Sequence, residues 1–192
     1  MTILDAPTRI IIPAIWLAWA TLWIVAAFYT KATRWRESIG SRARHVVPFL
    51  ICFVLLAAPR SLPAVLTARV VAPGRLLPLL GALLVAAGLG LAVWARWHLG
   101  RNWSGVVTLK QDHALIRTGP YRAIRHPIYT GLLLALVGTA AAIGEWRGVL
   151  AVICALAGIL WKIRVEEERM RQTFAEYEQY RKGTAALIPL LY

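Results

Sequence analysis

Acidic residues are scarce in this chain of 192 residues, which contains 9 Asp and Glu against 22 Lys and Arg and has a formal net charge of +13. Cysteine is scarcer still, because Cys52 and Cys154 are the only two and both lie within apolar stretches. This usage argues against a disulfide framework or a thiolate metal site. The four histidines lack the paired spacing of metal ligands, so we expect no metal.

Two further absences concern the organisation of the chain. The first residues lack a basic segment followed by a small-residue cleavage site, so we expect the first apolar stretch to be a retained span. Internal repeats and low-complexity segments are also lacking. We therefore expect residues 1–192 to form a single integral membrane domain, of which 1–95 hold three spans and 96–192 the functional core.

Long apolar stretches are abundant, since 59% of the residues are hydrophobic and the mean hydropathy is +0.60. About 20 apolar residues are needed to cross roughly 30 Å of hydrocarbon as a helix. The sequence predicts an all-α polytopic membrane protein with five transmembrane helices, the last two forming a hairpin that turns at 144–148. The predicted spans are Ile10–Tyr29, Val46–Leu66, Leu76–Trp97, Ile128–Ile143 and Val149–Ile163.

The basic residues are sorted by loop, which argues against nucleic acid as the partner despite the charge. Of the 22, 17 lie within 31–44, 96–125 and 162–182, and five lie elsewhere. Short loops rich in Lys and Arg stay in the cytoplasm, so we expect the N-terminus outside and the C-terminus in the cytoplasm. The Ala-, Leu- and Arg-rich composition is typical of a bacterial protein, so we expect a bacterial inner membrane, with its lipids as partners.

Polar chemistry is concentrated in residues 118–131, directly in front of the fourth predicted span. This segment contains Arg122, Arg125 and His126. Charged groups at membrane depth are costly and are usually retained for function. An alternative for His126 is a cap or headgroup contact, because Pro127 fits the first turn of a helix and holds the preceding residue extended.

A second polar group follows the fifth predicted span. A helix continuing over 162–177 places Lys162 and Glu166 on the same face as the apolar Met170, whereas Glu168 projects to the opposite side. A carboxylate on a buried face needs a cation or several donors as partner. The alternative is an exposed pair between Lys162 and Glu166 that solubilises the end of the helix.

Small residues recur along one face of each hairpin helix. This spacing lets two membrane helices approach closely, which favours packing of the bundle. The residues are Gly131, Ala135, Gly138 and Ala142 on the first helix and Ala151, Ala155 and Gly158 on the second.

The two polar groups together carry a family resemblance. Residues 118–131 contain Arg-His-Pro-Ile-Tyr-Thr-Gly, and Glu166-Glu167-x-x-Met170 follows about 35 residues later. This pair resembles the isoprenylcysteine carboxyl methyltransferase family and the related phospholipid N-methyltransferases, over roughly Trp97 to Pro189. The first three spans carry no such signature.

The resemblance implies an S-adenosylmethionine site at the cytoplasmic membrane surface, closed by a cytoplasmic C-terminal helix. Glu166 would pair with the ammonium of the cofactor, while backbone amides near the helix start at His126-Pro127 would accept its carboxylate. Lys162 stands where eukaryotic members tend to have Arg, and Ala175 replaces a frequent Gly. The implied cofactor contacts are His113, Ala114, Leu115, Ile116, Tyr121, His126, Pro127, Ile128, Tyr129, Glu166 and Glu167.

The methyl acceptor is expected to be a lipophilic or amphiphilic molecule that enters from the bilayer. A carboxylate acceptor, as on an isoprenylated cysteine, needs a cation to orient it, and Lys162 or Arg125 would serve. A phospholipid amine and a small lipophilic thiol or acid also fit. Two alternatives remain open: an NADPH-dependent membrane reductase like the sterol reductases, and a non-enzymatic membrane scaffold or carrier.

Overall fold

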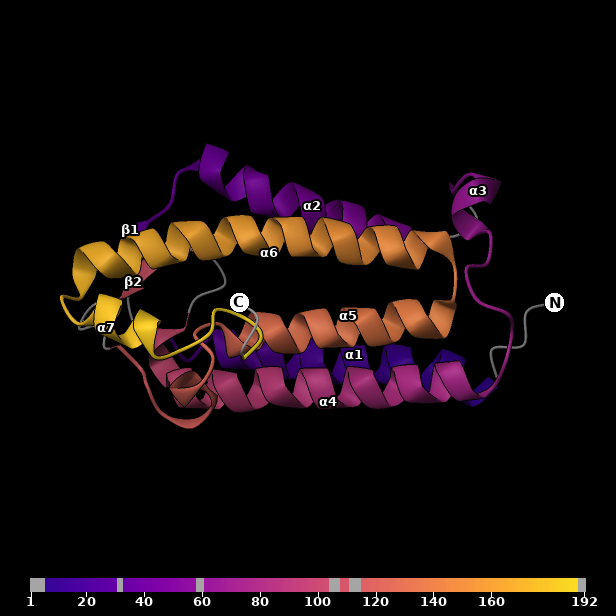
Figure 1. The fold of residues 1–192 in the computed structure, drawn as a ribbon, viewed down its shortest axis with the longest axis horizontal. Helices are drawn as coiled ribbons and strands as arrows, with labels where there is room; N and C mark the ends of the chain where they lie inside the picture. The colour runs from indigo at the N-terminus through magenta and orange to yellow at the C-terminus, as the bar shows by residue number, and fades with distance from the viewer. Residues whose placement is uncertain (1–5, 31–32, 58–60, 104–107, 111–114, 190–192) are drawn as a thin grey trace.

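The computed structural model describes residues 6–30, 33–57, 61–103, 108–110 and 115–189. The chain is helical apart from one short pair of strands in this described part (Figure 1). The long helices are α1 (Ala6–Ala27), α2 (Ile39–Ala57), α4 (Leu76–Leu99), α5 (Pro127–Ile143) and α6 (Trp146–Thr173). Shorter elements are α3 (Ala64–Thr67), η2 (Gly100–Asn102), η3 (Gly119–Arg122), α7 (Tyr177–Lys182), β1 (Thr33–Arg36) and β2 (Thr108–Lys110).

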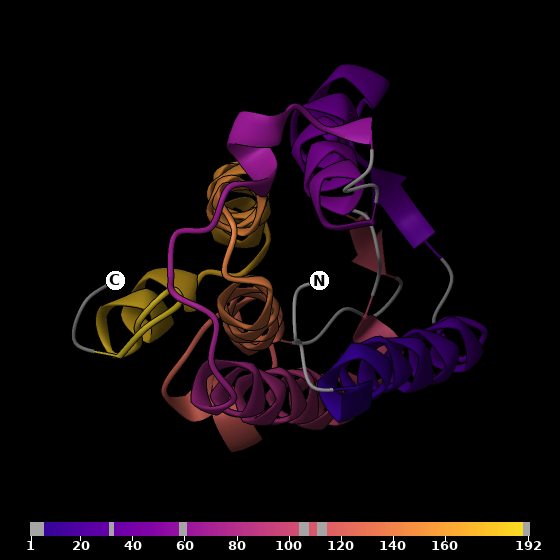
Figure 2. The same ribbon diagram turned by 90° about the vertical axis from the view of Figure 1, so that its right-hand side faces the viewer.

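The long helices pack as two pairs. Helix α2 lies along α6, α4 lies along α5, and α1 lies beside α4. Viewed along the helices, the α2–α6 pair faces the α4–α5 pair (Figure 2). Helices α5 and α6 are joined through Gly144, whose φ of 64° is readily adopted by glycine, and run side by side in opposite directions.

Four helices in the described part are long and apolar enough to cross a membrane. They cover Ile10–Ala27, Ile39–Ala57, Leu76–Asn102 and Trp146–Thr173. Helix α5 is apolar but has 17 residues, so it is shorter than these four. The chain is therefore an integral membrane protein, while the count of five spans and the orientation of the termini stay predictions.

Glycines allow α4 and α5 to approach at backbone distance. A Cβ placed on Gly88 of α4 would come within 2.7 Å of the backbone nitrogen of Ala135, and one on Gly131 of α5 within 2.9 Å of that of Ala92. Gly158 of α6 faces α2 instead, where a Cβ would lie 3.1 Å from the carbonyl oxygen of His45. The small residues of α5 thus pack against α4, and Gly158 of α6 packs against α2, so these two faces do not pack against each other.

We expect Gly88→Ala to destabilise the protein by about 1–3 kcal/mol, because the added methyl group overlaps backbone atoms that cannot move aside easily. Gly90, on the same helix, has open space within 4 Å of its Cβ position and provides a matched control. Thermal unfolding in detergent checks the prediction. Equal midpoints for Gly88→Ala and Gly90→Ala would show that the close approach of α4 and α5 contributes little.

The predicted straight helix over 162–177 is wrong at its end. Helix α6 stops at Thr173, and Phe174 has the extended angles φ −120° and ψ 115°. The chain then turns back into α7, which buries Tyr177 and Tyr180 against the rest of the fold. Burying two large aromatic side chains stabilises this turn more than one further turn of exposed helix would.

The connectors also differ from the prediction. Helix α2 begins at Ile39, within the basic segment that was expected to be loop. Strands β1 and β2 pair antiparallel and tie the connector after α1 to the one after α4. The sequence Val106-Val107-Thr108-Leu109 favours an extended segment. Thr108 and Leu109 belong to β2, whereas Val106 and Val107 lie outside the described residues.

Candidate active site

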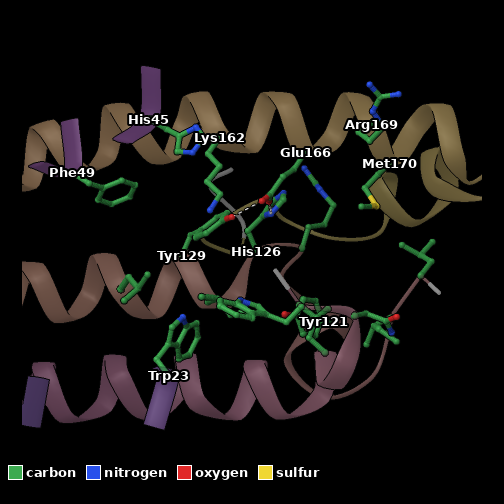
Figure 3. Close-up of a pocket in the computed structure, with 18 of the residues that line it drawn as sticks. Trp23, His45, Phe49, Tyr121, His126, Tyr129, Lys162, Glu166, Arg169 and Met170 are labelled. Atoms are coloured by element: carbon green, nitrogen blue, oxygen red, sulfur yellow. Dashed lines mark hydrogen bonds and ion pairs between the residues drawn. The ribbon is translucent and has the colours of Figure 1, made fainter. Parts of the chain in front are cut away.

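A cavity of about 600 Å³ lies where the long helices meet η2, η3 and α7 (Figure 3). Its volume is typical of a small-molecule site, for which about 300–1,000 Å³ is usual. The lining residues are Trp23, His45, Val46, Phe49, Leu50, Phe53, Leu99, Asn102, Trp103, Leu115, Ile116, Tyr121, Arg125, His126, Ile128, Tyr129, Leu132, Lys162, Glu166, Arg169, Met170, Tyr177 and Tyr180.

The lining changes from apolar to polar along the cavity. Trp23 and Phe49 lie toward one end, and Arg169 lies near the other (Figure 3). Lys162 and Glu166, one turn apart on α6, stand between these ends. The cavity therefore suits either one amphiphilic molecule or two molecules of different polarity placed end to end.

Three side chains form a hydrogen-bonded group in the cavity wall. The hydroxyl of Tyr129 donates a 2.6 Å hydrogen bond to Oε1 of Glu166, and Nδ1 of His126 lies 3.4 Å from Oε2 of the same carboxylate. The rings of His126 and Tyr129 are stacked, with centroids 5.6 Å apart. These contacts hold the Glu166 carboxylate in one position beside the cavity.

His126 stands between two carboxylates. Its Nε2 lies 3.3 Å from Oε1 of Glu167, in addition to its contact with Glu166. Burial disfavours the imidazolium, but the hydrogen bonds and charges of the two glutamates outweigh burial and raise the pKa of His126 above its usual 6.5. The two carboxylates therefore favour the protonated form of His126, whose positive charge offsets part of the charge of this acidic cluster.

The stability that His126 contributes to the fold should decrease as pH rises. Its pKa is higher in the folded protein, so the contribution is complete below about pH 6.5 and is lost as pH rises through the folded-state pKa. The unfolding midpoint of the wild type should therefore exceed that of His126→Gln most at low pH, and the difference should shrink at alkaline pH. A constant difference would mean that folding leaves the pKa of His126 unchanged.

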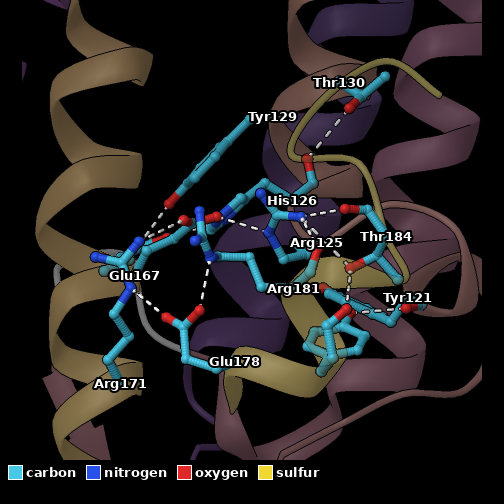
Figure 4. A network of polar contacts seen from close by, with 12 residues as sticks. Tyr121, Arg125, His126, Tyr129, Thr130, Glu167, Arg171, Glu178, Arg181 and Thr184 are labelled. Atoms are coloured by element: carbon cyan, nitrogen blue, oxygen red, sulfur yellow. Dashed lines mark hydrogen bonds and ion pairs between the residues drawn. The ribbon is translucent and has the colours of Figure 1, made fainter. Parts of the chain in front are cut away.

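Arg125 fixes the C-terminal segment to the site (Figure 4). Its Nε donates a 2.7 Å hydrogen bond to Oε1 of Glu167, and its Nη1 donates to the carbonyl oxygens of Arg181 and Thr184. The guanidinium and Glu167 are both about 9% exposed. A buried pair with these additional hydrogen bonds joins the segment between η3 and α5 to α6, to α7 and to the residues after α7.

The backbone of the same C-terminal segment covers the start of α5. The amides of Arg125 and His126 donate hydrogen bonds of 2.8 Å and 3.1 Å to the carbonyl oxygens of Ala185 and Ala186. The hydroxyl of Thr130 donates a 2.7 Å bond to the carbonyl of Leu187. A cofactor carboxylate was expected near this helix start, but the chain itself occupies these two amides.

A second contact holds α7 over η3. The hydroxyl of Tyr180 donates a 2.7 Å hydrogen bond to the carbonyl oxygen of Tyr121. Burial raises the pKa of Tyr180 to about 12, so the phenol keeps its proton and remains a donor at neutral pH. Tyr121 and Tyr180 thus line the polar end of the cavity as one fixed aromatic surface.

Lys162 brings a cation into the cavity. The residue is 8% exposed, and its Nζ lies 5.3 Å from the centroid of the Tyr129 ring. Glu166 is one turn further along α6, whereas Glu168 is 60% exposed on the outer side of that helix and pairs with Arg171. The structure thus places Lys162 and Glu166 inward and Glu168 outward.

The structure brings together most of the residues implied by the resemblance. Arg125, Lys162, Leu115, Ile116, Tyr121, His126, Ile128, Tyr129 and Glu166 line the cavity. Pro127 is buried at the first position of α5, and Glu167 is buried against Arg125; both are outside the lining. His113 and Ala114 lie outside the described residues.

The sequence analysis missed the part of the cavity formed by the first half of the chain. Trp23 of α1 and His45, Phe49 and Phe53 of α2 all line it. The signal was present, because 45, 49 and 53 follow the i, i+4, i+8 spacing of one helix face. A histidine on a helix face that otherwise carries phenylalanines indicates a polar group in a mainly apolar lining.

Comparison with known proteins places these features in a family. The phospholipid methyltransferase family matches residues 76–177, which is more than half of the chain. This chain belongs to the phospholipid methyltransferase family. The match begins at the start of α4 and ends at Tyr177, so it includes the third predicted span, in which no signature was expected.

Two proteins of known name are similar to this chain in sequence. The chain is 33% identical over 125 residues to the protein-S-isoprenylcysteine O-methyltransferase of Saccharomyces cerevisiae, covering 61% of this chain and 51% of that protein. It is 31% identical over 96 residues to the cobalt-zinc-cadmium resistance protein CzcN of Cupriavidus metallidurans, covering 48% and 44%. The chain thus spans about half the length of the curated relatives it matches.

A solved structure shares the fold of this phospholipid methyltransferase family member. The eukaryotic intramembrane Ras methyltransferase ICMT superposes with a TM-score of 0.53 and 21% sequence identity, over 82% of this chain and 55% of the other. At this identity the likeness shows the arrangement of helices alone. The predicted family is therefore confirmed by the family match, and the predicted helical membrane fold is supported by this structure.

Proposed function

We propose that this protein is a membrane methyltransferase that uses S-adenosylmethionine and acts at the cytoplasmic surface of a bacterial inner membrane. The acceptor is a lipophilic or amphiphilic molecule that enters from the bilayer. A carboxylate on an isoprenylated cysteine is the acceptor that the names of the relatives favour. The observation that carries the proposal is the cavity itself, which joins the half-buried carboxylate of Glu166 to an apolar chamber among membrane helices.

The donor groups of the polar end fit S-adenosylmethionine. This cofactor has an ammonium, a carboxylate and a sulfonium, and when bound it supplies an electrophilic methyl group. Glu166 would pair with the ammonium. Tyr121, Tyr129 and Leu115 would surround the adenosyl and sulfonium portions, since aromatic faces attract cations. Because the carbonyl groups of Ala185 and Ala186 occupy the two amides just before α5, we assign the cofactor carboxylate to Arg169, a cation in the cavity lining.

The acceptor would occupy the apolar end. Phe49, Phe53 and Trp23 provide a surface for an alkyl or isoprenyl tail, and Lys162 would hold an anionic head at the junction with the polar end. A carboxylate is already ionised at neutral pH, so it needs orientation rather than a base. Methyl transfer is an in-line displacement, for which positioning and exclusion of water supply most of the acceleration.

Binding measurements on the purified protein in detergent test the proposal. Titration with S-adenosylmethionine and S-adenosylhomocysteine should give saturable binding, whereas NADPH should not bind. Saturable binding of NADPH alone would favour the reductase alternative, and binding of none of the three would favour a scaffold or carrier. Transfer of a labelled methyl group to S-farnesylcysteine should then be measured with the same preparation.

The proposed orientation can be tested by cysteine labelling. In a variant lacking Cys52 and Cys154, single cysteines at the exposed positions Gly40 and Gln179 should be protected from a membrane-impermeant maleimide in intact cells. A cysteine at the exposed Ala72, between the second and third spans, should react. Labelling of Gly40→Cys and Gln179→Cys from outside would reverse the orientation and place the site on the outer surface.

A further inference from the structure

A histidine in the wall of the cavity and the glutamate beside it have no role in the proposed function. His45, in the second turn of α2, is 3% exposed and lines the cavity, as do Phe49 and Lys162. Its Nε2 lies 3.5 Å from Oε1 of Glu37, whose side chain is 1% exposed. The hydroxyl of Ser41 donates a 2.9 Å hydrogen bond to the other oxygen of that carboxylate. One edge of the imidazole is therefore held by a fixed acidic group.

The other ring nitrogen of His45 is buried and has no hydrogen-bond partner among the described residues. Leaving a buried polar atom without a partner costs about 1–3 kcal/mol, so such an atom in a cavity wall calls for an explanation. The hydrogen bond made by one ring nitrogen decides which nitrogen carries the proton. Glu37 favours the proton on Nε2, and Nδ1 then has a lone pair that can accept a proton.

The surroundings of His45 are set by three helices. Helices α2 and α6 are in close contact here, since a Cβ on Gly158 would lie 3.1 Å from the His45 carbonyl oxygen. Figure 3 shows His45 next to Lys162 on one side of the cavity. The charged and titratable groups around the imidazole are Glu37 and Arg42 from its own segment, Lys162 and Glu166 from α6, and Tyr129 from α5.

We propose that His45, oriented by Glu37, accepts the proton of a protic methyl acceptor, and that the cavity therefore methylates lipophilic thiols in addition to carboxylates. This inference rests on the proposed methyl transfer. A carboxylate acceptor needs no base, whereas a thiol must lose its proton to become a good nucleophile; the pKa of a cysteine thiol is about 8.5, and that of a simple alkanethiol is higher. The Lys162 cation stabilises a thiolate and repels an ammonium, so the site favours a thiol over an amine.

The reaction balances without any further reactant. The S–H bond of the acceptor breaks, and its proton goes to Nδ1 of His45. The electron pair left on that sulfur forms the new S–CH₃ bond, while the bond from the methyl carbon to the sulfonium breaks and its electron pair neutralises the sulfonium. The products are a methyl thioether, S-adenosylhomocysteine and a proton. Glu37 also lines a second cavity of about 460 Å³ together with the exposed Ser38 and Glu168, so the proton can leave through Glu37.

The test uses the full chain in detergent with two acceptors that share one alkyl tail, dodecanethiol and dodecanoate. The wild type should methylate both. His45→Gln should lower kcat for dodecanethiol by roughly 100-fold or more near neutral pH, the usual contribution of a general base. The lost rate should recover as pH rises and the thiol ionises by itself. Turnover of dodecanoate and the Kd for S-adenosylhomocysteine should stay within a few-fold of wild type, and Glu37→Gln should show a smaller loss of the same kind.

Three outcomes would overturn the inference. Full thiol turnover by His45→Gln would show that the imidazole takes no proton. Methylation of dodecanoate without any methylation of dodecanethiol by the wild type would leave the proposed function intact and remove the thiol activity; this result does not depend on any variant folding. Failure of the wild type both to bind S-adenosylhomocysteine and to methylate either acceptor would instead refute the proposed function itself.

Discussion

Glu166→Gln is expected to weaken S-adenosylmethionine binding by roughly 30-fold or more, because removing one partner of a buried charge pair costs about 2–5 kcal/mol. Glutamine keeps the shape of the side chain and a hydrogen-bond acceptor for Tyr129, but it loses the charge that would attract the cofactor ammonium. Isothermal titration in detergent, with S-adenosylmethionine and S-adenosylhomocysteine, measures the change.

Glu168→Gln is the matched control. It removes the same charge two residues away, on the exposed side of α6, where the carboxylate pairs with Arg171 in solvent. Surface pairs contribute little, so its Kd should equal that of the wild type. Equal and small losses in the two variants would mean that Glu166 serves to solubilise the end of the helix rather than to bind the cofactor.

Lys162→Met is expected to abolish methyl transfer to an anionic acceptor while S-adenosylhomocysteine binding stays within a few-fold of wild type. Methionine fills a similar volume on α6, so the loss would come from the missing cation rather than from an empty space. Turnover with a labelled methyl donor and the Kd for S-adenosylhomocysteine give the two readings. Undiminished turnover would point to a neutral acceptor that another group activates.

Arg125→Met is the informative companion to Lys162→Met, because both cations were predicted to hold the acceptor. The bonds of Arg125 to Glu167 and to the carbonyls of Arg181 and Thr184 predict a different result for its variant. The unfolding midpoint should fall, and cofactor binding should weaken as the C-terminal segment loosens. A stable Arg125→Met protein with normal cofactor binding and no turnover would return Arg125 to the acceptor.

The part of the site that could be predicted from the sequence followed from helical periodicity within short segments of the chain. Lys162 and Glu166 face the cavity and Glu168 faces away, as expected from positions on one continuous helix. The start of α5 at Pro127 followed from the fixed φ of proline. Each of these features is decided within a few residues of chain, so it requires no knowledge of which helices are neighbours.

The features that the sequence did not predict depend on neighbours far apart in the chain. His45 reaches the site only because α2 packs on α6. The face of small residues that includes Gly131 and Ala135 could pack against any of several helices by its sequence, and in the structure it packs against α4. The end of α6 at Thr173 is set by the burial of Tyr177 in a later turn. Contacts between helices far apart in the chain produce no periodic pattern within either helix that would identify its neighbour.

The position of the C-terminal segment has a consequence for biosynthesis. Residues 184–187 supply the carbonyl groups that bind Arg125, the amide of His126 and the hydroxyl of Thr130. Helices α1 to α6 are all made before these residues leave the ribosome, since a chain is synthesised from its N-terminus. The membrane bundle can thus insert and pack while the polar end of the cavity is still incomplete. Premature termination shortly after α7 should yield a protein that inserts normally but lacks the carbonyl groups that hold Arg125, His126 and Thr130 in place.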